Sequence, residues 1–146
     1  MKINTRARYA IRMMADILKN SNGNTVPLKD VANRQNLSKR YLSQLAIPLK
    51  NAKLLKSVWG MNGGYMLGLE PEEIRILDII VAVDGPINII DCIVEETPCE
   101  RAPFCECNVL WQDINDTITS RLALYTLADL GSGIKKKSLQ LNKNNR

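Results

Sequence analysis

The chain has 146 residues, of which 45% are hydrophobic and 24% are charged, and its formal net charge is +5. This is the length and composition of one globular domain, which excludes a disordered chain and a collagen-like rod. No apolar run approaches the roughly 18 residues of a membrane span, and arginines interrupt the N-terminal segment, so we expect no secretory signal and a cytoplasmic location.

The first predicted element is a helix from Thr5 to Asn20, with Thr5 as its N-cap. Its apolar residues recur at spacings of three and four, as is typical of a helix with one buried face. The arginines of this segment lie off that face. The sequence Asn22-Gly23-Asn24 then predicts a turn.

Two short helices in close succession are predicted next. The first runs from Leu28 to Gln35, and Asn36 tolerates the left-handed conformation that ends a helix. Ser38 can cap the following helix, which we expect over residues 38–47 because Pro48 should kink or end it. Two short helices joined by so tight a turn indicate a helix-turn-helix, whose second helix reads DNA bases.

A β-hairpin is predicted directly after these helices. Leu54–Val58 and Tyr65–Leu67 have the composition of strands, and the intervening loop Trp59–Gly64 contains three glycines, which favour a tight connection. A helix-turn-helix followed at once by a hairpin is a winged helix.

The C-terminal half predicts further helices. One is expected to begin at Pro71 and to stop at Asp84–Pro86, and a long one begins at about Asn108. The long helix carries an apolar stripe formed by Leu110, Ile114, Ile118, Leu122 and Tyr125. Because the N-terminal domain has a core of its own, we expect this stripe to pack against a second copy in a homodimer. A short capped helix follows at Thr126.

The predicted fold class is therefore mainly α with a small β-hairpin (α+β), consisting of a winged helix-turn-helix domain and a long dimerisation helix. We divide the chain into a DNA-binding domain (1–86), a cysteine-bearing loop (87–107), a dimerisation helix with a short C-terminal helix (108–130), and a basic tail expected to be disordered (131–146).

The charge is strongly polarised along the chain. Residues 1–68 carry twelve basic and two acidic side chains, residues 69–134 carry three basic and thirteen acidic ones, and the last twelve residues add five cations. Such a basic half is typical of a nucleic-acid binder. The main alternative, an anionic membrane surface, requires a basic amphipathic helix that the sequence does not contain.

All four cysteines, Cys92, Cys99, Cys105 and Cys107, lie in the 87–107 loop, which is rich in proline and acidic residues. A disulfide framework is not expected in a cytoplasmic protein of this size. A thiolate-bound metal would order such a loop. The long, irregular spacings fit an iron–sulfur cluster better than zinc, although zinc and free redox-active thiols stay open.

Several motifs carry a family resemblance: Lys2–Ala10, Val26–Ala32, Tyr41-Leu42 with Gln44-Leu45, Gly60–Tyr65, Asp84–Pro86, Leu110-Trp111 and Thr126–Leu130. In these motifs the chain resembles the Rrf2 family of bacterial winged-helix transcription regulators, especially its iron–sulfur cluster branch. The likeness extends from Met1 to about Leu130.

The resemblance implies a dimeric DNA-binding regulator that holds a cluster with Cys92, Cys99 and Cys105. In the branch that controls cluster biosynthesis, a histidine completes a [2Fe–2S] site, but the corresponding position is Asn108 and this chain contains no histidine. We choose Cys107 as the fourth ligand, with an acid of the partner subunit, a small thiol or water as alternatives. A [2Fe–2S] cluster is favoured, and a [4Fe–4S] cluster is the alternative.

Two departures from the family pattern concern DNA. Trp59 occupies the place of a wing arginine and can stack or wedge instead, and Ser43 replaces a glutamate that discriminates between operators. The expected DNA-binding residues are Thr5, Arg6, Arg8 and Lys39 for phosphates, Ser38, Arg40, Tyr41, Ser43 and Gln44 for major-groove bases, and Trp59, Asn62 and Gly63 in the wing. A dimer would bind half-sites about 34–36 Å apart on a pseudo-palindromic operator.

The function that follows is a transcription regulator sensing cluster, redox, iron or nitric oxide status and controlling iron–sulfur or related stress genes. The alternative is a cytoplasmic zinc- or thiol-binding interaction protein without an operator. Catalysis is not expected, because the chain has no histidine base, no P-loop and no nucleophile with a suitable partner.

Overall fold

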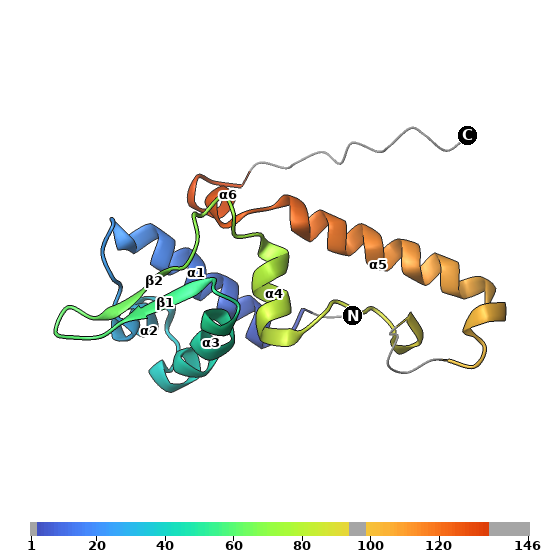
Figure 1. Ribbon diagram of the computed structural model, residues 1–146, viewed down its shortest axis with the longest axis horizontal. Coiled ribbons are helices and arrows are strands. Elements are labelled where there is room, and N and C mark those ends of the chain that lie inside the picture. The colour runs from blue at the N-terminus through green and yellow to red at the C-terminus, as the bar shows by residue number, and fades with distance from the viewer. Residues whose placement is uncertain (1–2, 94–98, 135–146) are drawn as a thin grey trace.

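A computed structural model of the protein describes residues 3–93 and 99–134. Its elements are α1 (Thr5–Ser21), α2 (Leu28–Gln35), α3 (Lys39–Asn51), β1 (Leu55–Val58), β2 (Gly64–Leu67), α4 (Ile76–Asp84), the 3₁₀ turns η1 (Asp91–Ile93) and η2 (Ala102–Phe104), α5 (Glu106–Leu124) and α6 (Leu127–Gly131). Figure 1 shows α1–α4, the hairpin and α6 gathered at one end, with α5 reaching away from them. The predicted fold class, mainly helical with a small antiparallel hairpin, is confirmed. The prediction for the tail beyond residue 134 lies outside the described residues.

Helix α1 is capped by Asn4, so the predicted cap at Thr5 is wrong by one residue. The Asn4 side-chain oxygen accepts a hydrogen bond from the Ala7 N–H at 2.9 Å, which satisfies one of the free donors at the helix start. The Asn4 side-chain nitrogen donates to Asp84 at the end of α4. Asparagine and threonine are both preferred N-cap residues, so residue type alone did not distinguish Asn4 from Thr5.

The helix-turn-helix has the predicted local geometry. Asn36 ends α2 in the left-handed conformation, with φ of 54°, and the Ser38 hydroxyl accepts from the Tyr41 N–H at 3.0 Å. The predicted end of the third helix is wrong, since α3 continues through Pro48 to Asn51. Burial of Leu49 in the core holds this last turn in place although proline removes one backbone hydrogen bond.

One hydrophobic core lies beneath these elements. The side chains that are entirely or almost entirely inaccessible come from all four N-terminal helices, the first strand, the residues before α4, and α6. They include Ala10, Met13, Met14, Ile17, Val31, Leu42, Leu45, Leu49, Leu55, Ile74, Ile79 and Leu127. Helix α6 thus packs on α1 and completes the core of the winged-helix end, although it follows the long helix in sequence.

The hairpin forms the wing. β1 and β2 pair in antiparallel register, with Leu55 opposite Leu67 and Val58 opposite Gly64. A bridge between Val26 and Tyr65 attaches the hairpin to the segment between α1 and α2, through N–H···O distances of 2.8 and 2.9 Å. The wing is therefore fixed to the helical core as well as to itself.

Helix α4 begins at Ile76, five residues after the predicted start at Pro71. The delay has a long-range cause, because Ile74 accepts from the Leu127 N–H and Ile76 donates to the Tyr125 carbonyl, both at 2.8 Å. These hydrogen bonds flank a bridge between Arg75 and Thr126 and keep Arg75 extended beside the segment that joins α5 to α6.

Helix α5 contains no buried residue. It contacts α4 and the short turn η1, and Figure 1 shows its C-terminal end beside α4 and its N-terminal part standing clear of the core. The expected capping box after it is confirmed, since Thr126 and Asp129 bond to each other at the start of α6. Among the described helices none is both long and apolar enough to cross a bilayer.

Candidate nucleic-acid interface and cysteine segment

The N-terminal half of α3 presents part of the predicted base-reading set. Arg40 and Gln44 are exposed, as is Lys39. Ser38 and Ser43 use their hydroxyls within the helix: Ser38 accepts from the Tyr41 N–H, and Ser43 donates to the Lys39 carbonyl at 3.0 Å. The side chains best placed to meet bases are therefore Arg40 and Gln44.

Tyr41 is half-buried and packs edge-on against Tyr9 of α1, with ring centroids 5.9 Å apart. The guanidinium groups of Arg8 and Arg12 lie 5.9 and 5.2 Å from the centre of the Tyr9 ring. Cation–π contacts of this kind hold the charges over the aromatic ring. Tyr41 thus helps to hold α1 and α3 together, and its half-buried ring is less available to a base than the exposed side chains of α3.

The start of α1 carries the predicted phosphate-binding residues Thr5, Arg6 and Arg8, all of which are exposed. Arg6 has a second contact that the sequence did not reveal, since its Nε donates to the Val83 carbonyl at the end of α4 at 3.1 Å. Together with the hydrogen bond from Asn4 to Asp84, this fixes the start of α1 to the end of α4.

The wing ends in large apolar side chains. Trp59 is 92% exposed, and Met61, which sequence reasoning passed over, is fully exposed. Of the other predicted wing residues, Asn62 is exposed, and its carbonyl accepts from the Thr25 hydroxyl at 2.6 Å. A side chain on Gly63 would approach the Val58 carbonyl to 2.5 Å, so the tight turn requires glycine there.

A buried acid joins α1 to α2 beneath this surface. Asp16 is 5% exposed and accepts two hydrogen bonds at 3.1 Å and one at 2.7 Å from Arg34, with others from Gln35 and Asn20. Burial opposes ionisation of the carboxyl, but the hydrogen bonds and charge of Arg34 outweigh it and hold the pKa of Asp16 below its ordinary value. Arg12, which donates to the Gln35 side chain and carbonyl, continues the network.

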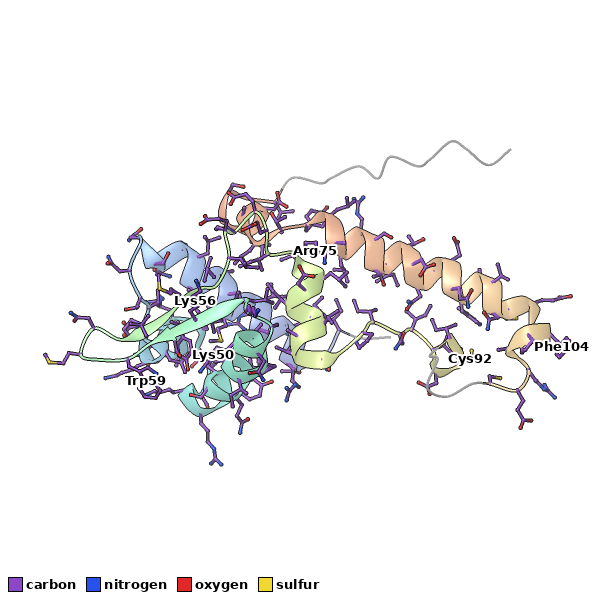
Figure 2. All side chains as sticks on the ribbon, in the orientation of Figure 1. Lys50, Lys56, Trp59, Arg75, Cys92 and Phe104 are labelled. Carbon is purple, nitrogen blue, oxygen red and sulfur yellow. The ribbon has the colours of Figure 1, made fainter. Side chains whose placement is uncertain are left out.

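The four cysteines lie at the opposite end of the molecule from the wing. Figure 2 shows Cys92 and Phe104 beside the start of α5, far from Trp59. Cys92 belongs to η1, Cys105 is the N-cap of α5, and Cys107 lies in the first turn of α5. All four are free thiols, of which Cys99 and Cys107 are exposed and the other two half-buried.

The structure does not gather these thiols into a finished site. Within residues 3–93 and 99–134, no three cysteine, aspartate or glutamate side chains lie close enough to hold one metal ion. The backbone around them is held by single turns, in which Ile93, Ala102, Phe104 and Cys105 each donate to the carbonyl three residues earlier. One longer-range tie comes from Asn115 of α5, which accepts from the Ile89 N–H at 3.1 Å.

Comparison with known proteins identifies the family. Residues 3–133 match the model of the Rrf2 family, described as iron-dependent transcriptional regulators. This chain belongs to the Rrf2 family. It is 40% identical to the HTH-type transcriptional regulator CymR of Bacillus subtilis over 132 residues, which cover 90% of this chain and 91% of CymR.

Other Rrf2 proteins are similarly close. The regulator IscR of Aliivibrio salmonicida is 38% identical over 130 residues, covering 89% of this chain and 77% of IscR. Among solved structures, B. subtilis CymR, described as its global cysteine regulator, superposes with a TM-score of 0.74 at 39% identity, covering 90% of this chain and 97% of CymR. IscR of T. potens gives 0.72 at 34% identity, covering 89% and 85%.

Rrf2 membership makes the protein a DNA-binding transcriptional regulator with a winged helix. It disfavours the alternative of an interaction protein without an operator, and its relatives are regulators rather than enzymes. CymR and IscR resemble this Rrf2 chain about equally, so the family alone does not choose between cysteine-related and iron-related regulation.

Proposed function

We propose that this Rrf2 regulator binds duplex DNA with α3 in the major groove and the wing at the adjacent minor groove, and that it works in the cytoplasm. The observation that carries the proposal is the exposed start of α3, where Lys39, Arg40 and Gln44 face solvent in a half of the chain with a net charge of +10. Lys39, Arg6 and Arg8 supply phosphate contacts, and Arg40 and Gln44 meet base edges.

The proposal includes a homodimer formed through α5. This helix spans 19 residues without burying one, and Leu110 and Val109 are 51% and 73% exposed. A helix whose apolar stripe is left half-covered gains stability by packing against a second copy of itself. The two winged-helix domains of one dimer, which we call its reading heads, would then each bind one half-site of a pseudo-palindromic operator.

We further propose that Cys92, Cys99 and Cys105 hold an iron–sulfur cluster, with Cys107 as the fourth ligand. The chemistry of the donor set fits, because four free thiols lie in one segment and thiolates are the ligands such clusters take. The single turns that hold this segment let the thiols approach one another without disturbing the buried core. When bound, the cluster supplies a redox-sensitive centre, favoured as [2Fe–2S] with [4Fe–4S] as the alternative.

A second candidate has its own support. The similarity to CymR, a global cysteine regulator in B. subtilis, and the exposure of Cys99 and Cys107 favour a regulator that responds to thiol status without a metal. In that case the same DNA-binding surface would be controlled by the thiols themselves.

The contacts between the two ends of the molecule suggest how the cysteine segment acts on DNA. The segment is tied to α5 by the hydrogen bond between Ile89 and Asn115, and it leaves α4 beside the contacts from Arg6 to Val83 and from Asn4 to Asp84. Reorganisation of residues 87–107 would therefore move the start of α1 and change the separation of the two reading heads. Equal operator affinity of the protein with and without cluster would contradict this step.

Anaerobic purification with iron and sulfide analysis tests the choice between the candidates. A coloured protein containing both elements supports the cluster, and their ratio to protein gives its type. A colourless, iron-free protein whose DNA affinity changes with thiol reagents supports the second candidate. Substitution of Cys92, Cys99 or Cys105 by alanine should abolish the visible absorption, and an unchanged spectrum in Cys107→Ala would exclude Cys107 as a ligand.

A further inference from the structure

The tip of the wing is apolar and uncharged although its surroundings are basic. Residues 57–69 contain no charged side chain, whereas Lys50, Lys53 and Lys56 precede them and are exposed. Trp59 and Met61 present 92% and 103% of their surfaces to solvent, and nothing in the described part of the chain covers them. Single exposed apolar side chains are common on protein surfaces, but several large ones on one loop indicate a contact surface.

The wing holds these side chains on a rigid support. The hairpin is bonded to the segment after α1 at three points: two bonds join Val26 and Tyr65, and the third runs from Thr25 to the Asn62 carbonyl. Within the loop, Gly63 donates to the Gly60 carbonyl at 3.0 Å. Side chains at Gly63 and Gly64 would each come within 2.5 Å of a backbone oxygen, so the loop is closely packed. A preorganised loop loses little conformational entropy when it binds.

The surrounding charge identifies the partner. A wing that attracts DNA only through phosphates would carry cations at its tip, and this tip has none. The exposed lysines before the tip and the cations at the start of α3 nevertheless attract negative charge. They therefore favour a polyanion as the partner over a neutral surface or an ordinary protein surface. In the proposed binding mode α3 occupies the major groove, and the wing lies at the neighbouring minor groove. Apolar side chains at a minor groove insert between base pairs and bend the duplex.

We propose that Trp59, assisted by Met61, wedges into a base-pair step at the minor groove and bends the bound DNA. This inference rests on the proposed function and adds a bending step that depends on an aromatic side chain rather than on charge. Specificity at the wing then comes from steps that unstack easily, such as those with a pyrimidine followed by a purine, and not from hydrogen bonds to base edges.

Fluorescence of the full-length chain gives a direct test. The sequence contains two tryptophans, so Trp111→Phe leaves Trp59 as the sole indole emitter. The probe is a duplex selected by the wild-type protein from random-sequence DNA, labelled at both ends for energy transfer. We expect binding to quench Trp59 emission and to bring the labels closer, consistent with a bend of roughly 20° or more.

The matched variants separate the wedge from ordinary attraction. Trp59→Ala should lower affinity about tenfold, as expected for loss of one stacked aromatic, and remove the bend, while leaving the salt dependence of binding unchanged. Trp59→Phe should restore part of the bend, and Trp59→Arg should restore affinity with a steeper salt dependence but no bend. Because Trp59 is exposed, each variant should melt at the wild-type temperature.

Two outcomes would overturn the wedge. If Trp59→Ala binds and bends the duplex as the wild type does while Lys39→Ala binds weakly, the wing tip does not enter DNA although the proposed function stands. If Trp59 emission is unchanged by DNA but is quenched by a co-purifying protein, the tip is a protein-binding surface. Failure of the wild-type chain to select any duplex would instead contradict the proposed function itself.

Discussion

The two ends of the molecule are organised in different ways. The winged-helix end has a continuous core of fully buried side chains, and an ion pair between the buried Asp16 and the partly exposed Arg34 joins two of its helices. The arm formed by the cysteine segment and α5 has no buried residue among those described in η1, η2 and α5. The first end is stable by its own packing, whereas the arm is completed by something else, which we propose to be a second subunit and a ligand of the thiols.

A core substitution gives the largest expected contrast. Leu45 is fully buried, and Leu45→Ala should lower the free energy of unfolding by about 3 kcal/mol through lost burial and the cavity left behind. Leu110, which is 51% exposed on α5, is the matched control, and Leu110→Ala should change subunit stability by roughly 0.5 kcal/mol or less. Thermal or denaturant unfolding of both variants at concentrations that keep the protein monomeric measures the difference. Equal losses would mean that the arm is as tightly packed as the core.

The ion pair between Arg34 and Asp16 should have the next largest effect. Arg34→Ala should cost about 2 kcal/mol, less than the roughly 3–5 kcal/mol of a fully buried pair, because 38% of the Arg34 side chain is exposed and solvent screens it. Lys19→Ala, an exposed change on the same helix, is the control.

The pH dependence of that difference has a definite sign. The folded pKa of Asp16 lies below its ordinary value, so the unfolded chain binds the proton first and the network stabilises the protein fully above about pH 4. The difference between wild type and Arg34→Ala should therefore be constant near neutral pH and shrink as the pH falls below about 4. Urea unfolding at several pH values checks this, and a difference that grows in acid would refute it.

Removing a positive charge should weaken DNA binding at the winged-helix end of the molecule but not on the arm. Arg40→Ala should weaken binding to a selected duplex about tenfold, or about 1.4 kcal/mol, and reduce specificity at one base pair. Arg101→Ala removes another exposed arginine, this one from the arm, and should change affinity by less than about twofold if only the winged-helix end meets DNA. Affinities measured at several salt concentrations test both, and an equal loss in the two variants would place DNA on the arm as well.

The smallest effect is expected for the hydrogen bond that joins the cysteine segment to α5 within the arm. Asn115→Ala removes the acceptor of the Ile89 N–H and should increase the local opening of that amide by about 1 kcal/mol without shifting the melting temperature. Hydrogen exchange at Ile89 measures it. Thr117→Ala removes a hydroxyl bonded only within α5 and should leave this amide unchanged.

Features set by near neighbours could be predicted from the sequence. Asn36 and Thr126 have the expected roles at helix ends because a cap depends on a few adjacent residues. The hairpin could be predicted because its tight loop has no room for side chains at certain positions, and glycines stand in that loop. Trp59 stood out for another reason, since it occupies the place of a wing arginine in the family that the chain resembles.

Features set by distant contacts could not be predicted. The start of α4 depends on pairing with residues 125–127, and the continuation of α3 past Pro48 depends on burial of Leu49. The contact between Arg6 and Val83 joins residues 77 positions apart, so no local pattern reveals it. The spacing of the four cysteines in the sequence does not determine how their thiols are arranged in space. A cysteine shows which kind of ligand is present, but the fold of the loop decides where that ligand lies.

The hydrogen bonds between residues 74–76 and 125–127 have a mechanical consequence. The chain leaves the C-terminal end of α4, runs through the cysteine segment and α5, and returns to pair beside the N-terminal end of the same helix. The whole arm is thus a closed loop fastened at both ends of one nine-residue helix, about 13 Å long. Because the loop has no free end, a change in its shape would be transmitted to α4, the helix that packs against both α1 and α3.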